Sequence, residues 1–174
     1  MAEAPAFSPS TETDFLPING TDYIEFYVGN AKQAAYYYQS AFGFQIIGYR
    51  GLETGSREAT SYLLQQGKIR FVLTAALTAD SFIAEHVRRH GDGVRDIALW
   101  VDDARHAFEE TVRRGARPVR EPEVLEDEHG RVVIAAIATY GDTIHSFVER
   151  RDYHGLFMPG FEPWENPYWK PGPV

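Results

Sequence analysis

The six histidines of this 174-residue chain are the first candidates for acid–base or metal chemistry. His86 and His90 stand four apart in an expected helix, a spacing that places two imidazoles on one face, as in helical metal sites. No glutamate lies between them, and they share the last turns with Arg88 and Arg89. Because cations complement the negative end of a helix, we interpret the pair as helix-end charges rather than metal ligands.

A second pattern lies in the segment "DTIHSFVERR", which alternates as a strand does. Alternation places His145 and Glu149 on one face of that strand and Ser146 on the other. The face is either the remnant of a polar cleft or a core surface with a hydrogen-bonded histidine, and we favour the second interpretation.

Other reactive patterns are missing. The chain has no cysteine, hence no disulfide framework and no thiolate ligand or nucleophile. "HGDGVRD" lacks the G-x-G-x-x-G order of a dinucleotide loop, and no G-K-[ST] phosphate motif is present. A formal net charge of −8 disfavours nucleic acid and anionic lipid as partners. No apolar run approaches the roughly 20 residues of a membrane span, and we expect a soluble, cytoplasmic protein with neither nucleic-acid nor membrane partners.

Apolar alternation and spacings of three and four predict the same order of elements twice, strand, helix and three strands. The first set is expected at residues 22–29, 30–43, 44–51, 59–67 and 68–76. The second set is expected at residues 95–103, 103–116, 117–126, 130–139 and 142–151. A connecting helix at about 80–90 ends before Gly91, with Phe82, Ile83, Ala84 and Val87 expected on its inner side.

The two sets form an internal repeat that is visible in the residues themselves. A shift of 73 places aligns similar or identical residues, namely Ile24 with Ile97, Phe26 with Leu99, Tyr27 with Trp100, Val28 with Val101, Asn30 with Asp103, Ala31 with Ala104, Lys32 with Arg105 and Ala34 with Ala107. Asn30 and Asp103 are of the types that cap helices. One set alone leaves an apolar sheet face uncovered, so two sets together make one core.

The sequence therefore divides into a folded middle and two different ends. Residues 1–16 are expected to be extended or disordered, and 17–152 to form one α+β domain with modules at about 21–76 and 94–151. Residues 153–174 are rich in proline, glycine and aromatic residues, typical of a surface tail or an interdomain linker. The large apolar side chains of this segment are expected to be exposed in the chain alone and covered by a partner. They are Phe157, Phe161, Trp164, Tyr168 and Trp169.

The paired modules resemble the vicinal oxygen chelate superfamily of glyoxalases and extradiol dioxygenases, in which a curved mixed sheet surrounds a cleft. The amino-acid sequence from about Ile18 to Phe161 is similar to that of the N-terminal half of the 4-hydroxyphenylpyruvate dioxygenase family. The segments that carry this resemblance are "IEFYVGNAKQAAYYYQSAFGF", "GSREATSYLLQQGKIRFVLT", "HGDGVRDIALWVDDA", "DEHGRVVIAAIATYGDTIHSFVER" and "YHGLFMPGF". The related 4-hydroxymandelate synthases share much of it, notably "HGDGV".

The resemblance implies an enzyme that converts 4-hydroxyphenylpyruvate to homogentisate in tyrosine catabolism with Fe(II) and O2. It places the two histidines and one carboxylate that hold the iron in a C-terminal half outside this chain. By the same resemblance, the superfamily's ligand positions fall here at Tyr23, Asp96 and Glu149. Two of these lack the imidazole expected of an iron site, and tyrosine is a poor ligand for Fe(II) at neutral pH. We therefore expect no metal, cofactor or catalytic residue in this chain.

The interpretation that follows is a structural half-enzyme, inactive alone, that packs against the catalytic domain and contributes to a homo-oligomer. Three alternatives remain open at this point. The chain could be a stand-alone protein that sequesters a small aromatic ligand, the matching half of a 4-hydroxymandelate synthase, or a single-domain extradiol-type dioxygenase.

Three consecutive tyrosines, 36 to 38, raise the question of a stacking platform for an aromatic ligand. On a helix begun at Asn30 and closed by Gly43, the inward stripe is expected to comprise Ala31, Ala34, Ala35, Tyr38, Ala41 and Phe42. Three neighbours in sequence point in three directions, so they cannot form one stacking surface. Tyr36 and Tyr37 are expected at a rim that a partner could cover.

Overall fold

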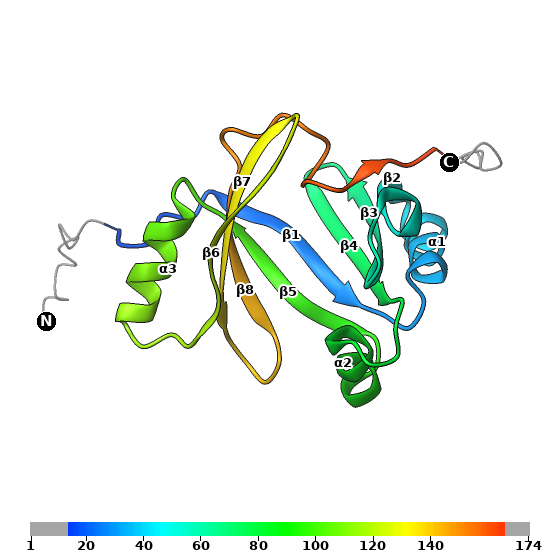
Figure 1. The fold of residues 1–174 in the computed structure, drawn as a ribbon, viewed down its shortest axis with the longest axis horizontal. Helices are drawn as coiled ribbons and strands as arrows, with labels where there is room; N and C mark the ends of the chain where they lie inside the picture. Colours follow the sequence, from blue (N-terminus) through cyan, green and yellow to red (C-terminus); the bar gives the residue numbers. More distant parts are fainter. Residues whose placement is uncertain (1–13, 166–174) are drawn as a thin grey trace, which may run out of the picture.

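The computed structural model describes residues 14–165. The segment expected at 1–16 therefore lies almost wholly outside the described residues, as do Tyr168 and Trp169. Within the described range, three α-helices flank one nine-stranded mixed sheet (Figure 1). The sheet bends along its middle, so one side is concave and the helices lie around the other.

The first module contains strand β1 (Gly20–Tyr27), helix α1 (Ala31–Phe42), β2 (Gln45–Arg50), β3 (Ala59–Gln66) and β4 (Ile69–Ala76). The second contains β5 (Gly93–Trp100), α3 (Ala104–Arg113), β6 (Pro118–Asp127), β7 (Gly130–Ala138) and β8 (Ile144–Glu149). Helix α2 (Phe82–His90) connects them, a 3-10 turn occupies Leu52–Thr54, and a short strand β9 (Glu162–Pro163) extends the first module. The predicted two-module order is confirmed, whereas β9 and the 3-10 turn were not anticipated.

The sheet order, β6-β7-β8-β5-β1-β4-β3-β2-β9, repeats one topology outward from its centre. In each module the first strand pairs in parallel with the last, β1 with β4 and β5 with β8. The modules meet where β1 runs antiparallel to β5, with Ile24 opposite Ile97. These two residues are equivalent in the 73-residue repeat, so a local two-fold axis passes between them.

The helices begin and end where the sequence indicates. Asn30 Oδ1 accepts a hydrogen bond from Gln33 N at 2.9 Å, and Asp103 Oδ1 accepts one from His106 N at 2.8 Å. Gly43 closes α1 with a left-handed φ of 74°, a conformation in which glycine has no side chain to clash. No helix in residues 14–165 is both long and apolar enough to cross a membrane.

Three apolar clusters form the core, one on each helix-covered outer face and one on the concave side. Helix α1 buries Ala31 and Ala35 against strands of the first module, and α3 does the same with Ala104 and Ala107 in the second. The concave cluster is lined by all of the central strands and closed by the chain that follows β8, from which it takes Tyr153, Phe157 and Met158.

The burial of the tail corrects one expectation. Phe157 is 2 % exposed, and Phe161 and Trp164 pack partly buried against core clusters. These three aromatic rings are thus covered by this chain's own sheet and not left for a partner. The sequence could not show this, because the contacts join the tail to strands more than 80 residues earlier.

The inward faces of two helices also differ in part from the prediction. In α1, Ala41 and Phe42 are exposed, and Gln39 completes the buried stripe, because the inward side follows a spacing of four from Ala31 and Ala35. Tyr37 is exposed and Tyr36 and Tyr38 are partly buried. The expected divergence is wrong for Tyr37 and Tyr38, because their rings meet edge-on with centres 5.5 Å apart. In α2, Phe82 is 58 % exposed while His86 is buried.

Candidate functional site

Two of the three positions at which the sequence resemblance placed ligands meet on the concave side of the sheet. Tyr23 on β1 and Asp96 on β5 are 73 residues apart, and the Tyr23 hydroxyl donates to Asp96 Oδ2 at 3.1 Å. They are 6 % and 3 % exposed. The internal repeat thus brings equivalent positions of the two modules into contact at the centre of the fold.

The Asp96 carboxylate accepts hydrogen bonds from two residues of the chain. Besides Tyr23, the backbone N–H of Ser146 donates to Oδ1 at 3.0 Å, and the Ser146 hydroxyl donates to Oδ2 at 2.5 Å. Burial raises the pKa of the Asp96 carboxyl, while the hydrogen bonds from Ser146 and Tyr23 act in the opposite direction. Burial, and then the nearby Asp96 charge, raise the pKa of Tyr23 well above its ordinary value.

Glu149 lies on the other side of the sheet. On β8 it shares a face with Phe147, which packs in the α3 cluster, and its Oε2 accepts a hydrogen bond from Ala104 N at 3.1 Å in the first turn of α3. A carboxylate at a helix N-terminus is stabilised there by free N–H groups and by the helix dipole. Tyr23, Asp96 and Glu149 therefore do not converge on one point.

Glu25 is a site residue that the sequence reasoning missed. It stands directly across from Asp96 in the β1–β5 pairing, and Thr74 Oγ1 donates to its Oε1 at 2.6 Å. Ser61 continues the chain of contacts, with its hydroxyl 2.9 Å from that of Thr74. Burial raises the Glu25 pKa to about 7, against the lowering effect of the Thr74 hydrogen bond, and Asp96 raises it further. The available signal was the charge inside the alternating strand "DYIEFYV".

A cleft of about 240 Å³ opens beside this polar group. Tyr23, Glu25, Arg50 and Arg120 supply its polar lining, and Phe157 and Met158 from the tail narrow it. The Arg50 guanidinium lies 5.3 Å from the centre of the Phe161 ring. Its Nε is buried and has no hydrogen-bond partner among residues 14–165.

An ion pair fastens the tail at the rim of the concave side. Arg150 Nε and Nη2 donate to the two oxygens of Asp22, each at 2.6 Å, and Arg150 Nη1 donates to the Phe157 carbonyl at 2.6 Å. The Asp22 side chain is 2 % exposed and that of Arg150 16 %. One guanidinium therefore joins β1, the end of β8 and the tail.

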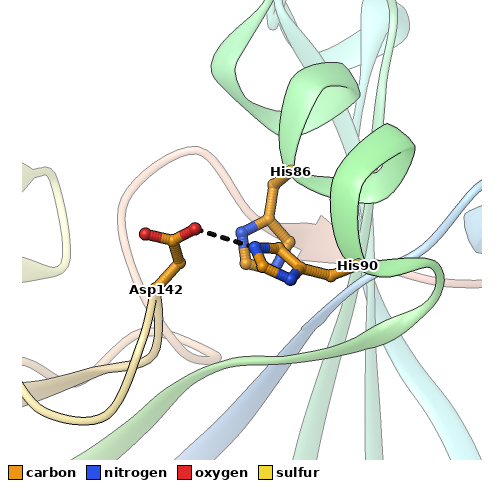
Figure 2. A group of neighbouring side chains, drawn as sticks. All are labelled: His86, His90 and Asp142. Carbon is orange, nitrogen blue, oxygen red and sulfur yellow. Dashed lines mark hydrogen bonds and ion pairs between the residues drawn. The ribbon is translucent and has the colours of Figure 1, made fainter.

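The histidines fall into two environments. His145 Nδ1 donates to the Ile97 carbonyl at 2.8 Å, so the prediction of a hydrogen-bonded histidine is confirmed. His86 and His90 share a side of α2, and Asp142 from the β7–β8 turn faces them (Figure 2). The prediction that both are helix-end cations is wrong for His86, since it is 6 % exposed and burial lowers its pKa.

The concave site can bind a proton near neutral pH through Glu25, and the buried Nε of Arg50 is left as a donor beside it. Residues 13–159 match the family model described as "Hydroxyphenylpyruvate dioxygenase, HPPD, N-terminal".

Curated relatives agree with that family. The chain is 48 % identical over 146 residues to 4-hydroxyphenylpyruvate dioxygenase of Dictyostelium discoideum, covering 83 % of this chain and 40 % of the relative. It is 47 % identical over 147 residues to the enzyme of that name from Yarrowia lipolytica, covering 82 % and 37 %. The chain thus spans about two fifths of the length of the curated relatives it matches.

Solved structures share the fold. A triple mutant of 4-hydroxymandelate synthase from Streptomyces coelicolor matches with a TM-score of 0.77 and 27 % identity, over 91 % of this chain and 45 % of that one. Methylmalonyl-CoA epimerase from Mycobacterium tuberculosis matches with a TM-score of 0.62 over 80 % of this chain and 93 % of that one. At 19 % identity, the epimerase shows likeness of fold alone.

Proposed function

Because the chain belongs to the family of hydroxyphenylpyruvate dioxygenase N-terminal domains, we propose that it is the structural, non-metal-binding half of a 4-hydroxyphenylpyruvate dioxygenase. In this proposal the Fe(II), which would supply O2 chemistry on the 2-oxo acid, belongs to a C-terminal domain outside this chain. The relatives named as dioxygenases are 41–48 % identical to it, whereas the synthase structure is 27 % identical, which favours the dioxygenase over the synthase.

The observation that supports the proposal most directly is that both carboxylate oxygens of Asp96 already accept hydrogen bonds. Its two oxygens accept three hydrogen bonds from Tyr23 and Ser146, and Glu149 points to the opposite side of the sheet. An Fe(II) centre needs at least three ligand atoms directed at one point. One engaged carboxylate and one neutral tyrosine do not fit that requirement, so we derive no catalytic step within this chain.

The proposal is tested with the isolated chain and with a chimera. The chimera carries this chain in place of the matching segment of the Dictyostelium relative. With Fe(II), ascorbate and 4-hydroxyphenylpyruvate supplied, we expect O2 consumption by the chimera and none by the isolated chain. Stoichiometric iron in the isolated chain, lost on Glu149→Ala, would overturn the proposal.

A variant in the chimera separates structural from ligand roles for the same residue. Glu149→Gln keeps an acceptor for Ala104 N, so the chimera should keep its iron content and its O2 consumption within a few-fold. A ligand role for Glu149 instead demands loss of iron together with activity. Urea unfolding of the variant shows whether any loss comes from the fold.

The cleft at Arg50 supports a second candidate, a binding protein for a small aromatic oxo acid. A carboxylate on the ligand would supply an acceptor for the buried Arg50 Nε. Calorimetric titration of the isolated chain with 4-hydroxyphenylpyruvate tests it. Saturable binding that Arg50→Gln abolishes would favour this candidate, and absence of binding would leave the structural role.

We also propose that the chain contributes to a homo-oligomer through the outer side of α1. Tyr37 and Phe42 are 59 % and 54 % exposed, and their ring centres lie 5.8 Å apart. Replacing Tyr36 and Tyr37 together by serine should weaken self-association in sedimentation velocity while leaving the far-UV circular dichroism intact. A lost fold with unchanged association would show that the helix faces are reversed.

A further inference from the structure

We propose that His86, His90 and Asp142 form a binding site for a divalent transition-metal ion, best suited to Zn(II), that fastens helix α2 to the β7–β8 turn. One ligand atom from each of the three side chains lies within 4.8 Å of the others. Figure 2 shows both imidazole rings beside the Asp142 carboxylate. This group lies apart from the concave cleft and is independent of the function proposed above.

The helix supplies two ligands in a fixed relation. His90 stands four positions after His86, so both rings leave the same face of α2, with ring centres 4.7 Å apart. The Tyr27 ring packs edge-on against His86 at 5.3 Å, which holds that imidazole in place. Buried packing of this kind orients a ligand before the metal arrives.

An unpartnered nitrogen is the second observation. His86 is 6 % exposed, and its Nδ1 is buried with no hydrogen-bond partner in the described part of the chain. A buried polar atom without a partner is costly, and a metal ion that binds the imidazole changes that balance.

Asp142 supplies the negative ligand from a distant segment. Its Oδ2 lies 2.7 Å from His90 Nε2, and a bound metal would replace this hydrogen bond. Zinc ligands sit 2.0–2.1 Å from the ion and hence roughly 3.3 Å from one another in a tetrahedron. His90 and Asp142 must therefore move slightly apart, and any ligand atom that lies nearer the 4.8 Å limit must move closer. A water molecule would complete four-coordination on the exposed side.

Two arginines contact Asp142, and only one of them competes with a cation for its carboxylate. Arg89 Nη1 lies 3.2 Å from Asp142 Oδ2, and Arg95 donates to the Asp142 backbone carbonyl. Arg89 also contacts Glu85 at 3.3 Å and can keep that partner when it leaves Asp142. Arg95 uses the carbonyl and leaves the carboxylate available. These contacts make Arg89 the residue that tunes metal affinity.

The test uses the full chain without a histidine tag, titrated with ZnCl2 by calorimetry and with Co(II) by visible absorption. We expect one Zn(II) per chain, Co(II) bands typical of tetrahedral coordination, and a higher unfolding temperature with zinc. His90→Asn and Asp142→Asn change half-exposed side chains and should each weaken binding about tenfold or more.

Two further variants make the result specific. His129→Gln alters an exposed histidine that lies 3.8 Å from Glu128, and it should bind zinc as the unmodified chain does. Arg89→Ala removes the competing cation and should bind zinc more tightly. The proposal is overturned by a lack of saturable zinc binding, by binding that survives both His90→Asn and Asp142→Asn, or by weaker binding in Arg89→Ala.

Discussion

Glu25 shows how one side chain can couple the interior of this fold to pH. It lies across from the buried Asp96 and receives a hydrogen bond from Thr74. Its pKa is raised from 4.5 to about 7, chiefly by burial. The folded chain therefore binds this proton more tightly than the unfolded chain does. The stabilisation is complete below pH 4.5 and is lost as pH rises through about 7.

We predict that Glu25→Gln flattens the pH dependence of stability. Between pH 5 and pH 8 the free energy of unfolding of the variant should change by about 2 kcal/mol less than that of the unmodified chain, because the amide does not titrate. Urea unfolding at the two pH values measures the difference. Glu58→Gln, at an exposed position, is the matched control for replacing a glutamate by glutamine. Parallel pH profiles for the unmodified chain and Glu25→Gln would contradict the pKa assignment.

The Asp22–Arg150 pair gives a second prediction at this scale. Asp22→Ala leaves a guanidinium that is 16 % exposed without its bidentate partner, so unfolding should become easier by about 3 kcal/mol. The Arg131–Asp152 pair is 58 % and 52 % exposed, and Asp152→Ala should cost less than about 1 kcal/mol. Urea denaturation compares the two variants. Equal losses would mean that burial does not set the strength of the Asp22 contact.

Among the elements, the repeated helix starts are what local sequence determines best. Asn30 and Asp103 adopt nearly the same backbone angles, φ −145° and ψ 100° against φ −142° and ψ 102°, and each caps the third residue beyond it. Both caps and the order of elements along the chain could be predicted because they depend on residues within a few positions of one another. The two-module α+β fold could be predicted from the 73-residue repeat and from the family resemblance.

We predict that Asn30→Ala and Asp103→Ala each reduce the free energy of unfolding by about 1 kcal/mol. The two caps lie in different modules and share no partner, so the double variant should show the sum within about 0.5 kcal/mol. Thermal and urea unfolding of the singles and the double measure this. Asp103→Asn keeps an acceptor oxygen and serves as the control. If the loss in free energy of unfolding of the double variant differed strongly from the sum of the single losses, the two caps would be energetically coupled and not independent.

The faces of elements were harder to predict than their existence. The two sides of a strand differ only by what packs there, and Glu149 was placed with Tyr23 and Asp96 although it caps α3. His86 was interpreted as a surface charge because the residues that lie near it in the fold, Tyr27 and Asp142, are each more than 50 positions away in the sequence. Local spacing carries no information about such contacts.

At the scale of the whole molecule, the tail completes the concave core. Phe157 packs edge-on against Tyr23 with ring centres 5.3 Å apart, and Gly48 lets Leu156 approach, since a Cβ there would lie 2.9 Å from Leu156 Cδ2. The carbonyl of Phe157 is bound by Arg150. The residues after β8 thus stabilise the sheet by packing on its concave side.

We predict that Phe157→Ala destabilises the chain by about 3–5 kcal/mol, because it empties a fully buried ring position. Phe42→Ala removes a ring that is 54 % exposed and should cost less than about 1 kcal/mol. Urea unfolding and binding of a hydrophobic dye report stability and exposure of the concave face. A small loss for Phe157→Ala would show that the tail lies on the sheet without supporting it.

The two-fold axis between Ile24 and Ile97 has a consequence for the chemistry of the centre. A pair of separate, identical modules joined about this axis would place the same side chain on both sides, tyrosine facing tyrosine or acid facing acid. Covalent linkage of the halves frees each side to differ, so a hydroxyl donor at 23 can meet a carboxylate acceptor at 96. The same freedom pairs Glu25 with Asp96 while its counterpart, position 98, is an alanine, which keeps a third and fourth buried acid out of the middle of the sheet. Two modules in one chain can thus carry different residues at equivalent positions of β1 and β5, whereas a symmetric dimer of identical modules cannot.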